Sequence, residues 1–442
     1  MKTGFLERAF RLGENGTTVR REVLGGATTF MTMSYIIFVQ PAVLGLTGMD
    51  KGAVMVATCL ASALATLLTG LLARYPIAQA PAMGHNIFFA VVVCGTMGYT
   101  WQVALGANFI SGIVFVVLAL AGLWGKVVAA VPDALKYGIA VGIGLLITLI
   151  GLEYGGIVVD SPGVLVALGD LSSPPVLLVL FGLALTAVLM VVRFPGAILV
   201  GMLATAVAGV PLGIVKYRGI MAPVPSLAPT FLKLDIAGAI SSGLVSVVFV
   251  FLLLDVFDAI GTLIGVGGSA GFLKDGRLPR ADKAMLADAV GTVGGVLLGT
   301  STVSSYIESV TGIAQGARTG LANVVTSGLF LCALFFSPLA EMFSGQVAYG
   351  GMVLRPVIAP ALIIVGSMMM KCVKFIDWDD LSEAIPAFLS IIIMPLTLSI
   401  TEGISFGFIS YVLLKLAAGK GRRVHPLVYL VAGLFVLRYV LK

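Results

Sequence analysis

The sequence predicts an all-α polytopic membrane protein, and two observations carry that prediction: the composition and the recurrence of apolar stretches. Of 442 residues, 59% are hydrophobic and only 11% are charged, whereas soluble domains carry about 25% charged residues. Apolar stretches recur from Val23 to the end of the chain, and each is long enough to span a bilayer core or nearly so. We expect these stretches to be helices, because a helix bonds its backbone polar groups within one segment.

Taken in order, the apolar stretches predict about fourteen transmembrane segments. A polar cytoplasmic N-tail without the apolar core of a signal peptide comes first, at 1–22. The first seven segments are 23–46, 52–73, 81–96, 101–124, 134–152, 175–192 and 194–212. A Pro-rich extracytoplasmic connector at 221–236 precedes 237–268, 285–299, 304–317, 319–340, 356–370, 384–400 and 403–418. A basic linker and an apolar run end the chain at 419–442. That run, 424–441, is an extra span, an interfacial helix, or a sign that 384–418 is divided wrongly.

The distribution of Lys and Arg supports this order and gives the chain an orientation. With the N-terminus in the cytoplasm, twenty of the 27 basic residues fall on the cytoplasmic side and five on the opposite side. Cytoplasmic loops of membrane proteins carry such an excess. We therefore expect a multi-pass protein of the cell (inner) membrane, and the net charge of +6 gives no indication of nucleic-acid binding.

The connector divides the segments into seven and seven, so the second half must enter the membrane from the opposite side. We expect two inverted repeats, 23–220 and 237–418, the usual architecture of secondary transporters. The third and tenth segments are short, and each has a polar or Pro-containing lead-in: PIAQAPAMGHNIFFA at 76–90 and LLGTSTVSSYIESVTG at 297–312. Short, interrupted segments at equivalent positions of two halves indicate a binding site.

Three carboxylic acids stand in otherwise apolar segments: Asp255, Asp258 and Glu308. Each costs about 2.5–3.5 kcal/mol at the centre of a span. Residues at i and i+3 share a helix face, so the two aspartates point the same way. Asn86 and His85 add polarity to the third segment. A buried hydrogen-bond network that locks helices together is the alternative to a binding site, and His85 is as well explained by packing or capping as by ligand contact.

The same segments exclude most other classes of protein. The sequence has no GxxxxGK[ST], HExxH or nucleophile-elbow motif, so we expect neither an ATP-driven motor nor an enzyme. The four cysteines have no metal-binding spacing, and we expect no metal and no cofactor other than a proton as coupling ion. Phe88 and Phe257, beside the polar residues, could stack on a flat ring.

Four segments resemble the AzgA-like purine permeases, a branch of the nucleobase–cation symporter-2 (nucleobase–ascorbate transporter) group. They are TTFMTMSYIIFVQPAVL (28–44), APAMGHNIFFA (80–90), LLDVFDAIGT (253–262) and GTSTVSSYIESVTGIAQGARTGL (299–321). The resemblance implies fourteen spans, with a core domain at about 23–124 and 237–340 and a gate domain at about 134–212 and 356–418. It also implies a homodimer in membrane lipid.

The resemblance also implies a set of site residues. Its substrate contacts fall on Asn86, Asp255 and Glu308, and its proton-linked acid falls on Asp258. In the wider group the substrate acid aligns at least as well with Asp258, so the two aspartates can exchange roles, and Glu308 is a third candidate for coupling. Many relatives read GMGLNA where this chain reads AMGHNI, which makes His85 a candidate for specificity. The expected binding set also includes Phe88, Phe257, Thr302 and Ser304.

The function expected from these residues is secondary active uptake of purine nucleobases, namely hypoxanthine, guanine or adenine. Burial raises the pKa of a carboxyl group, which suits proton symport, and the resemblance implies elevator-type alternating access. The alternative is an anion transporter of the same architecture, similar to sulfate permeases. Three acids at the centre of the site would repel an anion.

Overall fold

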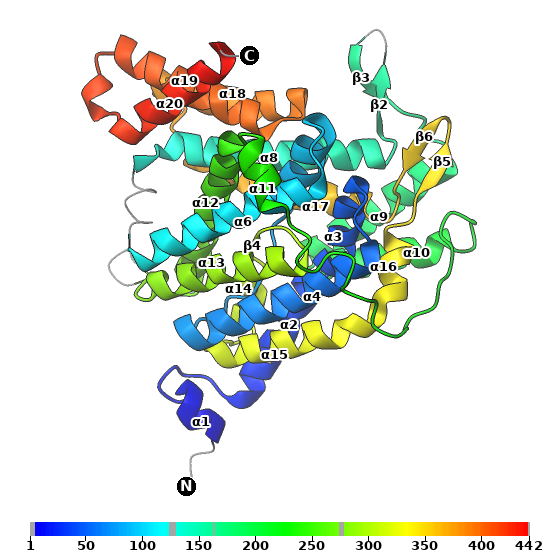
Figure 1. Cartoon of the computed structure of the whole chain (residues 1–442). Helices are drawn as coiled ribbons and strands as arrows, with labels where there is room; N and C mark the ends of the chain where they lie inside the picture. Colours follow the sequence, from blue (N-terminus) through cyan, green and yellow to red (C-terminus); the bar gives the residue numbers. More distant parts are fainter. Residues whose placement is uncertain (1–4, 123–129, 162–163, 274–277, 441–442) are drawn as a thin grey trace. The chain divides into compact units, whose positions relative to one another are not determined.

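The computed structural model describes residues 5–122, 130–161, 164–273 and 278–440. In this part of the chain eight helices are long and apolar enough to cross a membrane, and the fold is mostly helical, as predicted (Figure 1). The chain divides into two compact units: unit 1 comprises Met1–Gly122 and Asp170–Ala361, and unit 2 comprises Leu123–Gly169 and Leu362–Lys442.

The first part of unit 1 contains the first four predicted spans. Its elements are α1 (Phe5–Phe10), α2 (Val19–Met33), α3 (Ile36–Leu44), η1 (Gly45–Thr47), α4 (Lys51–Leu68), η2 (Thr69–Ala73), β1 (Gln79–Pro81), α5 (Met83–Ile87), η3 (Phe88–Thr96) and α6 (Trp101–Leu120). The third span is short and has an extended lead-in, as predicted, because β1 precedes α5. The predicted end of the fourth span at 124 lies outside the described residues.

The second part of unit 1 contains the connector and the matching segments. Its elements are α9 (Pro174–Val191), α10 (Ala197–Gly209), α11 (Ile236–Ser241), α12 (Val245–Ser269), α13 (Ala281–Leu298), β4 (Val303–Ser305), α14 (Ser309–Ala314), α15 (Gly320–Cys332), η4 (Ala333–Phe336), α16 (Ser337–Phe343), β5 (Val347–Tyr349) and β6 (Met352–Leu354). The predicted span 237–268 is two helices, and the predicted span 304–317 is helical only over α14.

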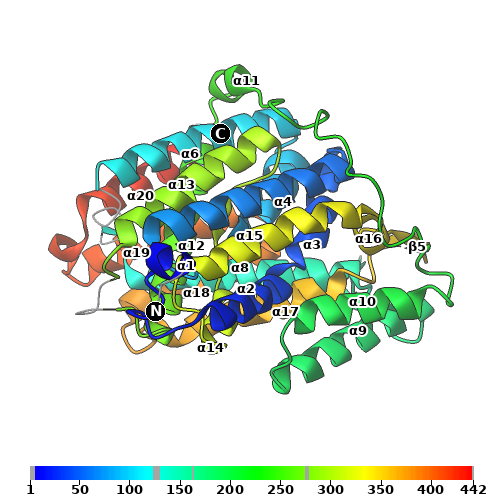
Figure 2. The same cartoon turned by 90° about the horizontal axis from the view of Figure 1, so that it is seen from below.

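Packing within unit 1 repeats itself between the two halves. Helices α6, α13, α4 and α15 lie side by side in that order (Figures 1 and 2). Helices α12 and α13 of the second half both pack on α6 of the first half. In the same way, α2 and α4 of the first half both pack on α15 of the second half. The second half of unit 1 thus makes the contacts that the first half makes, which is the pattern of a two-repeat fold.

Close helix contacts in unit 1 depend on small residues and on one buried acid. A Cβ at Gly320 would overlap the carbonyl oxygen of Gly70, so α15 can lie against η2 only without a side chain there. Glu22 is fully buried on α2 and accepts hydrogen bonds from the backbone N–H groups of Arg318 at 2.7 Å and Ala322 at 3.1 Å. Helix α2 therefore begins before residue 23, within the segment expected to be the N-tail.

Unit 2 is built around α18. Its elements are α8 (Asp133–Tyr154), β2 (Val158–Ser161), β3 (Val164–Leu168), η5 (Met370–Phe375), α18 (Leu381–Thr397), α19 (Ile400–Ala417), η6 (Gly421–Arg423) and α20 (Pro426–Val440), and most of α17 (Ala359–Met369) belongs to it. Helix α18 packs on α8 and on α19. The apolar run 424–441 is a helix, α20, whose Phe435 ring lies 6.3 Å from that of Phe408 on α19.

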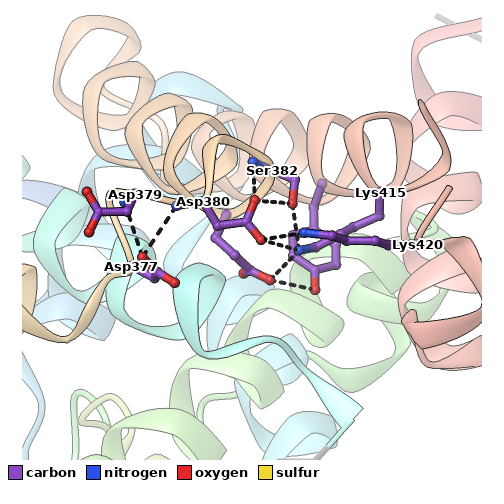
Figure 3. Close-up of polar contacts among 8 residues, drawn as sticks. Asp377, Asp379, Asp380, Ser382, Lys415 and Lys420 are labelled. Atoms are coloured by element: carbon purple, nitrogen blue, oxygen red, sulfur yellow. Dashed lines mark hydrogen bonds and ion pairs between the residues drawn. The ribbon is translucent and has the colours of Figure 1, made fainter. Parts of the chain in front are cut away.

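A network of charges joins α18 to α19 at one end of unit 2 (Figure 3). The buried ammonium of Lys415 lies 2.6 Å from Glu383 and 3.5 Å from Asp380, and it donates a hydrogen bond to the Ser382 hydroxyl at 2.7 Å. Lys420 contacts the same Asp380 carboxylate at 2.9 Å. Two cations and two anions therefore balance one another in this network.

Two sequence predictions remain open. The count of fourteen spans and the core-and-gate division stay predictions, since unit 1 takes in α9 and α10. Beside the predicted helices, the described residues form three short two-stranded antiparallel sheets, and one of them, β1–β4, contains the two predicted extended lead-ins. Two of these are hairpins, β2–β3 and β5–β6.

Candidate functional site

The two extended lead-ins of unit 1 pair with each other. Strand β1 runs antiparallel to β4, with Gln79 opposite Ser305, Ala80 opposite Ser304 and Pro81 opposite Val303. Pro81 fixes an extended backbone at one end, and β-branched Val303 favours a strand opposite it. Because α5 follows β1 and α14 follows β4, this short sheet brings together the third and tenth segments, which lie 215 or more residues apart at their contacts.

Asp255 and His85 form a buried pair at this sheet. His85 Nε2 lies 2.9 Å from Asp255 Oδ1, and both side chains are essentially inaccessible to solvent. The second carboxylate oxygen of Asp255 accepts a long hydrogen bond of 3.5 Å from the Ser111 hydroxyl on α6. The sequence did not decide whether His85 packs against its neighbours or contacts a ligand. In the structure its partner is Asp255.

Asp258 and Glu308 differ from Asp255 in that both are only half-buried. Asp258 lies one turn after Asp255 on α12, beside the hydroxyl of Ser304. Glu308 immediately precedes α14, and its carboxylate accepts a hydrogen bond of 3.0 Å from the Tyr35 hydroxyl. These two residues therefore keep some accessible surface, which Asp255 does not.

Amides and hydroxyls surround the lead-in of the tenth segment. The Ser301 hydroxyl donates to the carbonyl oxygen of the Asn86 side chain, and Gln40 Nε2 donates to Ser301 at 3.1 Å. The Thr302 hydroxyl donates to Asn108 Oδ1 at 2.8 Å. Asn86 and Thr302, both predicted site residues, are thus fully buried and held by neighbours on other segments.

The predicted aromatic residues fall in two different surroundings. Phe88 is fully buried and meets Phe251 of α12 edge to face, with ring centroids 4.8 Å apart. Phe257 is half-buried on α12, between the two aspartates. Phe88 therefore supports the helix that carries the acids, and Phe257 is the ring with accessible surface for stacking.

A further buried acid, Asp288 on α13, was not among the residues predicted from the sequence. Its Oδ2 accepts hydrogen bonds from the Ser305 backbone N–H at 3.1 Å, the Ser305 hydroxyl at 3.0 Å and Gln79 Nε2 at 3.3 Å. Asp288 thereby fixes both strands of the β1–β4 sheet. The available signal was an acid in the predicted span 285–299, which contains no other charged residue.

Several buried polar atoms around this sheet lack a hydrogen-bond partner among the described residues. They are Oε1 of Gln40, Oε1 of Gln79, Nδ2 of Asn108, Oδ1 of Asp288 and Oγ of Ser304. Nε2 of His85 and Oδ1 of Asp255 belong to the same set, because they lie within ion-pair distance without the alignment of a hydrogen bond. A buried polar atom without a partner costs about 1–3 kcal/mol. Cavities of about 620 and 370 Å³ lie elsewhere, so the case for a ligand site here rests on these atoms and the acids.

The arrangement suits a neutral polar ligand better than an anion. Four acids, Asp255, Asp258, Asp288 and Glu308, lie in the same part of unit 1, with His85 as the basic partner of one of them. Among the described residues no three His, Cys, Asp or Glu side chains are arranged to hold a metal ion. Acceptor oxygens with a nearby aromatic face are what a flat molecule with N–H donors requires.

Comparison with known proteins identifies relatives over the whole length of the chain. Residues 20–406 match the Permease family (Xan_ur_permease). The chain is 51% identical, over 99% of its length and 98% of the other, to a protein of Methanocaldococcus jannaschii named as a permease. It is 45% identical to the guanine/hypoxanthine permease PbuG of Bacillus subtilis, over 98% of both chains. It is 44% identical to the adenine permease AdeP of Escherichia coli, over 99% of this chain and 96% of AdeP.

Solved structures of the same fold belong to more distant proteins. The transmembrane domain of the cyanobacterial bicarbonate transporter BicA superposes with a TM-score of 0.63 at 15% identity, covering 89% of this chain and 97% of that domain. Murine Slc26a9, an anion transporter, superposes with a TM-score of 0.61 at 10% identity, covering 90% of this chain and 68% of that protein. At these identities the likeness establishes a shared fold.

Proposed function

The chain belongs to the Permease family, and on that premise we propose that it carries purine nucleobases across a membrane. The proposal rests on one observation: the acids of unit 1 outnumber the basic groups beside them, and two of those acids, Asp258 and Glu308, are only half-buried. The relatives named as guanine/hypoxanthine and adenine permeases support the purine class.

We propose that Asp258 and Glu308 hold the polar edge of the base. A carboxylate can accept two N–H hydrogen bonds at once, and a 6-oxopurine such as guanine presents adjacent N–H donors. Phe257, half-buried between the two aspartates, supplies a ring for the flat face. Asn86 orients the site through Ser301, and an amide that offers both a donor and an acceptor also suits the ring nitrogens.

We propose that the Asp255–His85 pair carries the coupling proton. The pair is buried and lies one helical turn from the proposed substrate acid, so a proton there changes the field that the base meets. In the unloaded state the excess negative charge opposes movement through an apolar surrounding. Proton and base together neutralise the acids, and only this loaded state moves at low cost, which is the elevator-type step we propose.

The membrane location, the orientation and the oligomeric state of the protein remain predictions from the sequence. We propose an inner membrane location with a cytoplasmic N-terminus, because of the distribution of Lys and Arg. The homodimer is implied by the resemblance.

Uptake into proteoliposomes tests the function. We expect labelled hypoxanthine, guanine or adenine to accumulate under an inward proton gradient, and not under a sodium gradient of equal size. Uracil and bicarbonate serve as the competing substrates. The Asp160→Asn variant is the control for loss of an acid, since Asp160 is exposed on β2. Saturable bicarbonate uptake without purine uptake would overturn the proposal in favour of an anion transporter.

A further inference from the structure

A basic cavity lies in unit 1 at the end of the span formed by α4 and η2. It has a volume of about 620 Å³ and is lined by four cationic residues and three leucines: Arg11, Arg74, Arg280, Lys283, Leu71, Leu72 and Leu286. None of these lining residues is acidic. The proposed transport site does not use any of them, so the cavity needs a separate explanation.

The leucines are the reason to expect this cavity at a membrane surface. Leu71 and Leu72 occupy the last turn of the span and are 51% and 42% exposed. Exposed leucines at the end of a span lie in lipid, where acyl chains cover them. Arg74 follows directly, so the boundary between apolar and charged surface falls inside the cavity.

The cations are arranged around this boundary by the backbone and by one ring. Arg74 ends η2 with a left-handed backbone, φ +56°, which non-glycine residues rarely adopt. The guanidinium of Arg280 lies 4.3 Å above the ring of the buried Tyr75, which holds it beside Lys283 at the start of α13. Arg11 contributes less to the charge of the cavity, because its guanidinium also lies 3.6 Å from the exposed carboxylate of Glu14.

We propose that this cavity binds the headgroup of an anionic phospholipid. The phosphate would meet Arg280, Lys283 and Arg74, and the first methylenes of the acyl chains would cover Leu71 and Leu72. Basic pockets at the ends of transmembrane helices recognise such headgroups, and guanidinium groups bind phosphate through paired N–H donors. A soluble anion would satisfy the cations and leave the leucines uncovered, which is why a lipid fits this cavity better.

Thermal unfolding of the purified, delipidated full chain in detergent tests the proposal. We expect phosphatidylglycerol to raise the unfolding temperature, and phosphatidylcholine and glycerol phosphate to leave it unchanged. The variant Arg280→Gln/Lys283→Gln should bind phosphatidylglycerol roughly 30-fold more weakly, at about 1 kcal/mol for each cation near a lipid surface. The charge-conserving variant Arg280→Lys/Lys283→Arg should keep most of the affinity.

The matched control is Lys371→Gln/Lys374→Gln, which removes two exposed cations from η5 in unit 2 and should bind phosphatidylglycerol as the unaltered protein does. If the first variant folds poorly, Arg74→Gln, at an exposed position, gives the same comparison. Equal stabilisation by phosphatidylcholine or by glycerol phosphate would overturn the proposal, as would equal losses in the control. Because the measurement is lipid binding, its outcome is independent of which solute the protein transports.

Discussion

Both units of the chain bury charged side chains, but the two buried clusters differ in balance. In unit 2, Lys415 and Lys420 meet Asp380 and Glu383, and each charge lies within 3.5 Å of an opposite one (Figure 3). In unit 1, four acids lie in the same region and His85 is the basic partner of one of them, Asp255, while polar atoms beside them lack partners among the described residues.

The balance of charge distinguishes a cluster that stabilises the fold from one that can bind a ligand. A balanced, hydrogen-bonded cluster holds its helices together and leaves no unpaired charge for a ligand to contact. In an unbalanced cluster, the buried charges and polar atoms without partners raise the free energy of the folded state. Only the binding of a proton or a ligand removes that cost. We therefore read the Lys415 network as a structural joint between α18 and α19, and the acids of unit 1 as the working site.

The largest expected effect is on stability, from Lys415→Met. Its side chain is 7% exposed, and its removal leaves the carboxylates of Glu383 and Asp380 without their buried cation. Breaking a buried ion pair by removing one partner costs about 3–5 kcal/mol. Because these carboxylates are partly exposed, we expect a loss of about 3 kcal/mol in the free energy of unfolding, measured by denaturation in mixed micelles.

The matched control for this prediction is Lys420→Met. Lys420 contacts Asp380 at 2.9 Å but its side chain is 40% exposed, so its loss should cost less than about 1 kcal/mol. Equal losses in the free energy of unfolding for the two variants would contradict the distinction between the buried ion pairs of Lys415 and the exposed ion pair of Lys420.

The second prediction concerns function in unit 1. Asp258→Asn should lower purine uptake about 10- to 100-fold, because a hydrogen bond to a charged group contributes about 1.5–3 kcal/mol. The free energy of unfolding should change by less than about 1 kcal/mol, since the residue is half-buried and the replacement has the same shape. A variant that unfolds readily yet transports normally when folded would reverse the roles of the two clusters.

A smaller effect should appear between His85 and Asp255. If the two act as one unit, the losses in uptake from His85→Gln and Asp255→Asn should not add, with a coupling energy of about 0.5–3 kcal/mol in a double-mutant cycle. The reference cycle pairs Asp255→Asn with Thr96→Val, an exposed position at the end of η3, and should be additive. Additive losses in both cycles would separate His85 from the acid.

The smallest effect is a pH dependence in unit 2. The Ser382 hydroxyl, with Lys420 and the Ser382 backbone N–H, lowers the pKa of Asp380 below its usual value. A carboxyl whose pKa is lowered by folding stabilises the fold above its unfolded pKa of about 4, and that contribution is lost as the pH falls. The difference in unfolding temperature between the unaltered chain and Asp380→Asn should therefore shrink from pH 7 towards pH 3. A difference that stays constant over this range would show that Asp380 acts only as a helix cap.

Local patterns in the sequence predicted much of the fold. The apolar runs located the helices, and Pro81 and the run of Thr and Ser at 300–305 gave the extended lead-ins of the third and tenth segments. Asp255, Asp258 and Glu308 were recognisable because a carboxyl group is costly in an apolar segment. Glu22 was not, since two arginines precede it at the end of a polar stretch and only the N–H groups near residue 320 explain its burial.

The class of the protein, the two-repeat plan and the acids in apolar segments could be predicted from the sequence, because composition, periodicity and burial cost are local properties of the chain. Which groups contact one another could be found only from the folded chain. The pairing of β1 with β4, the contact of His85 with Asp255 and the place of Asp288 join residues far apart in the chain. Such contacts depend on how helices pack in three dimensions, and no local pattern records that.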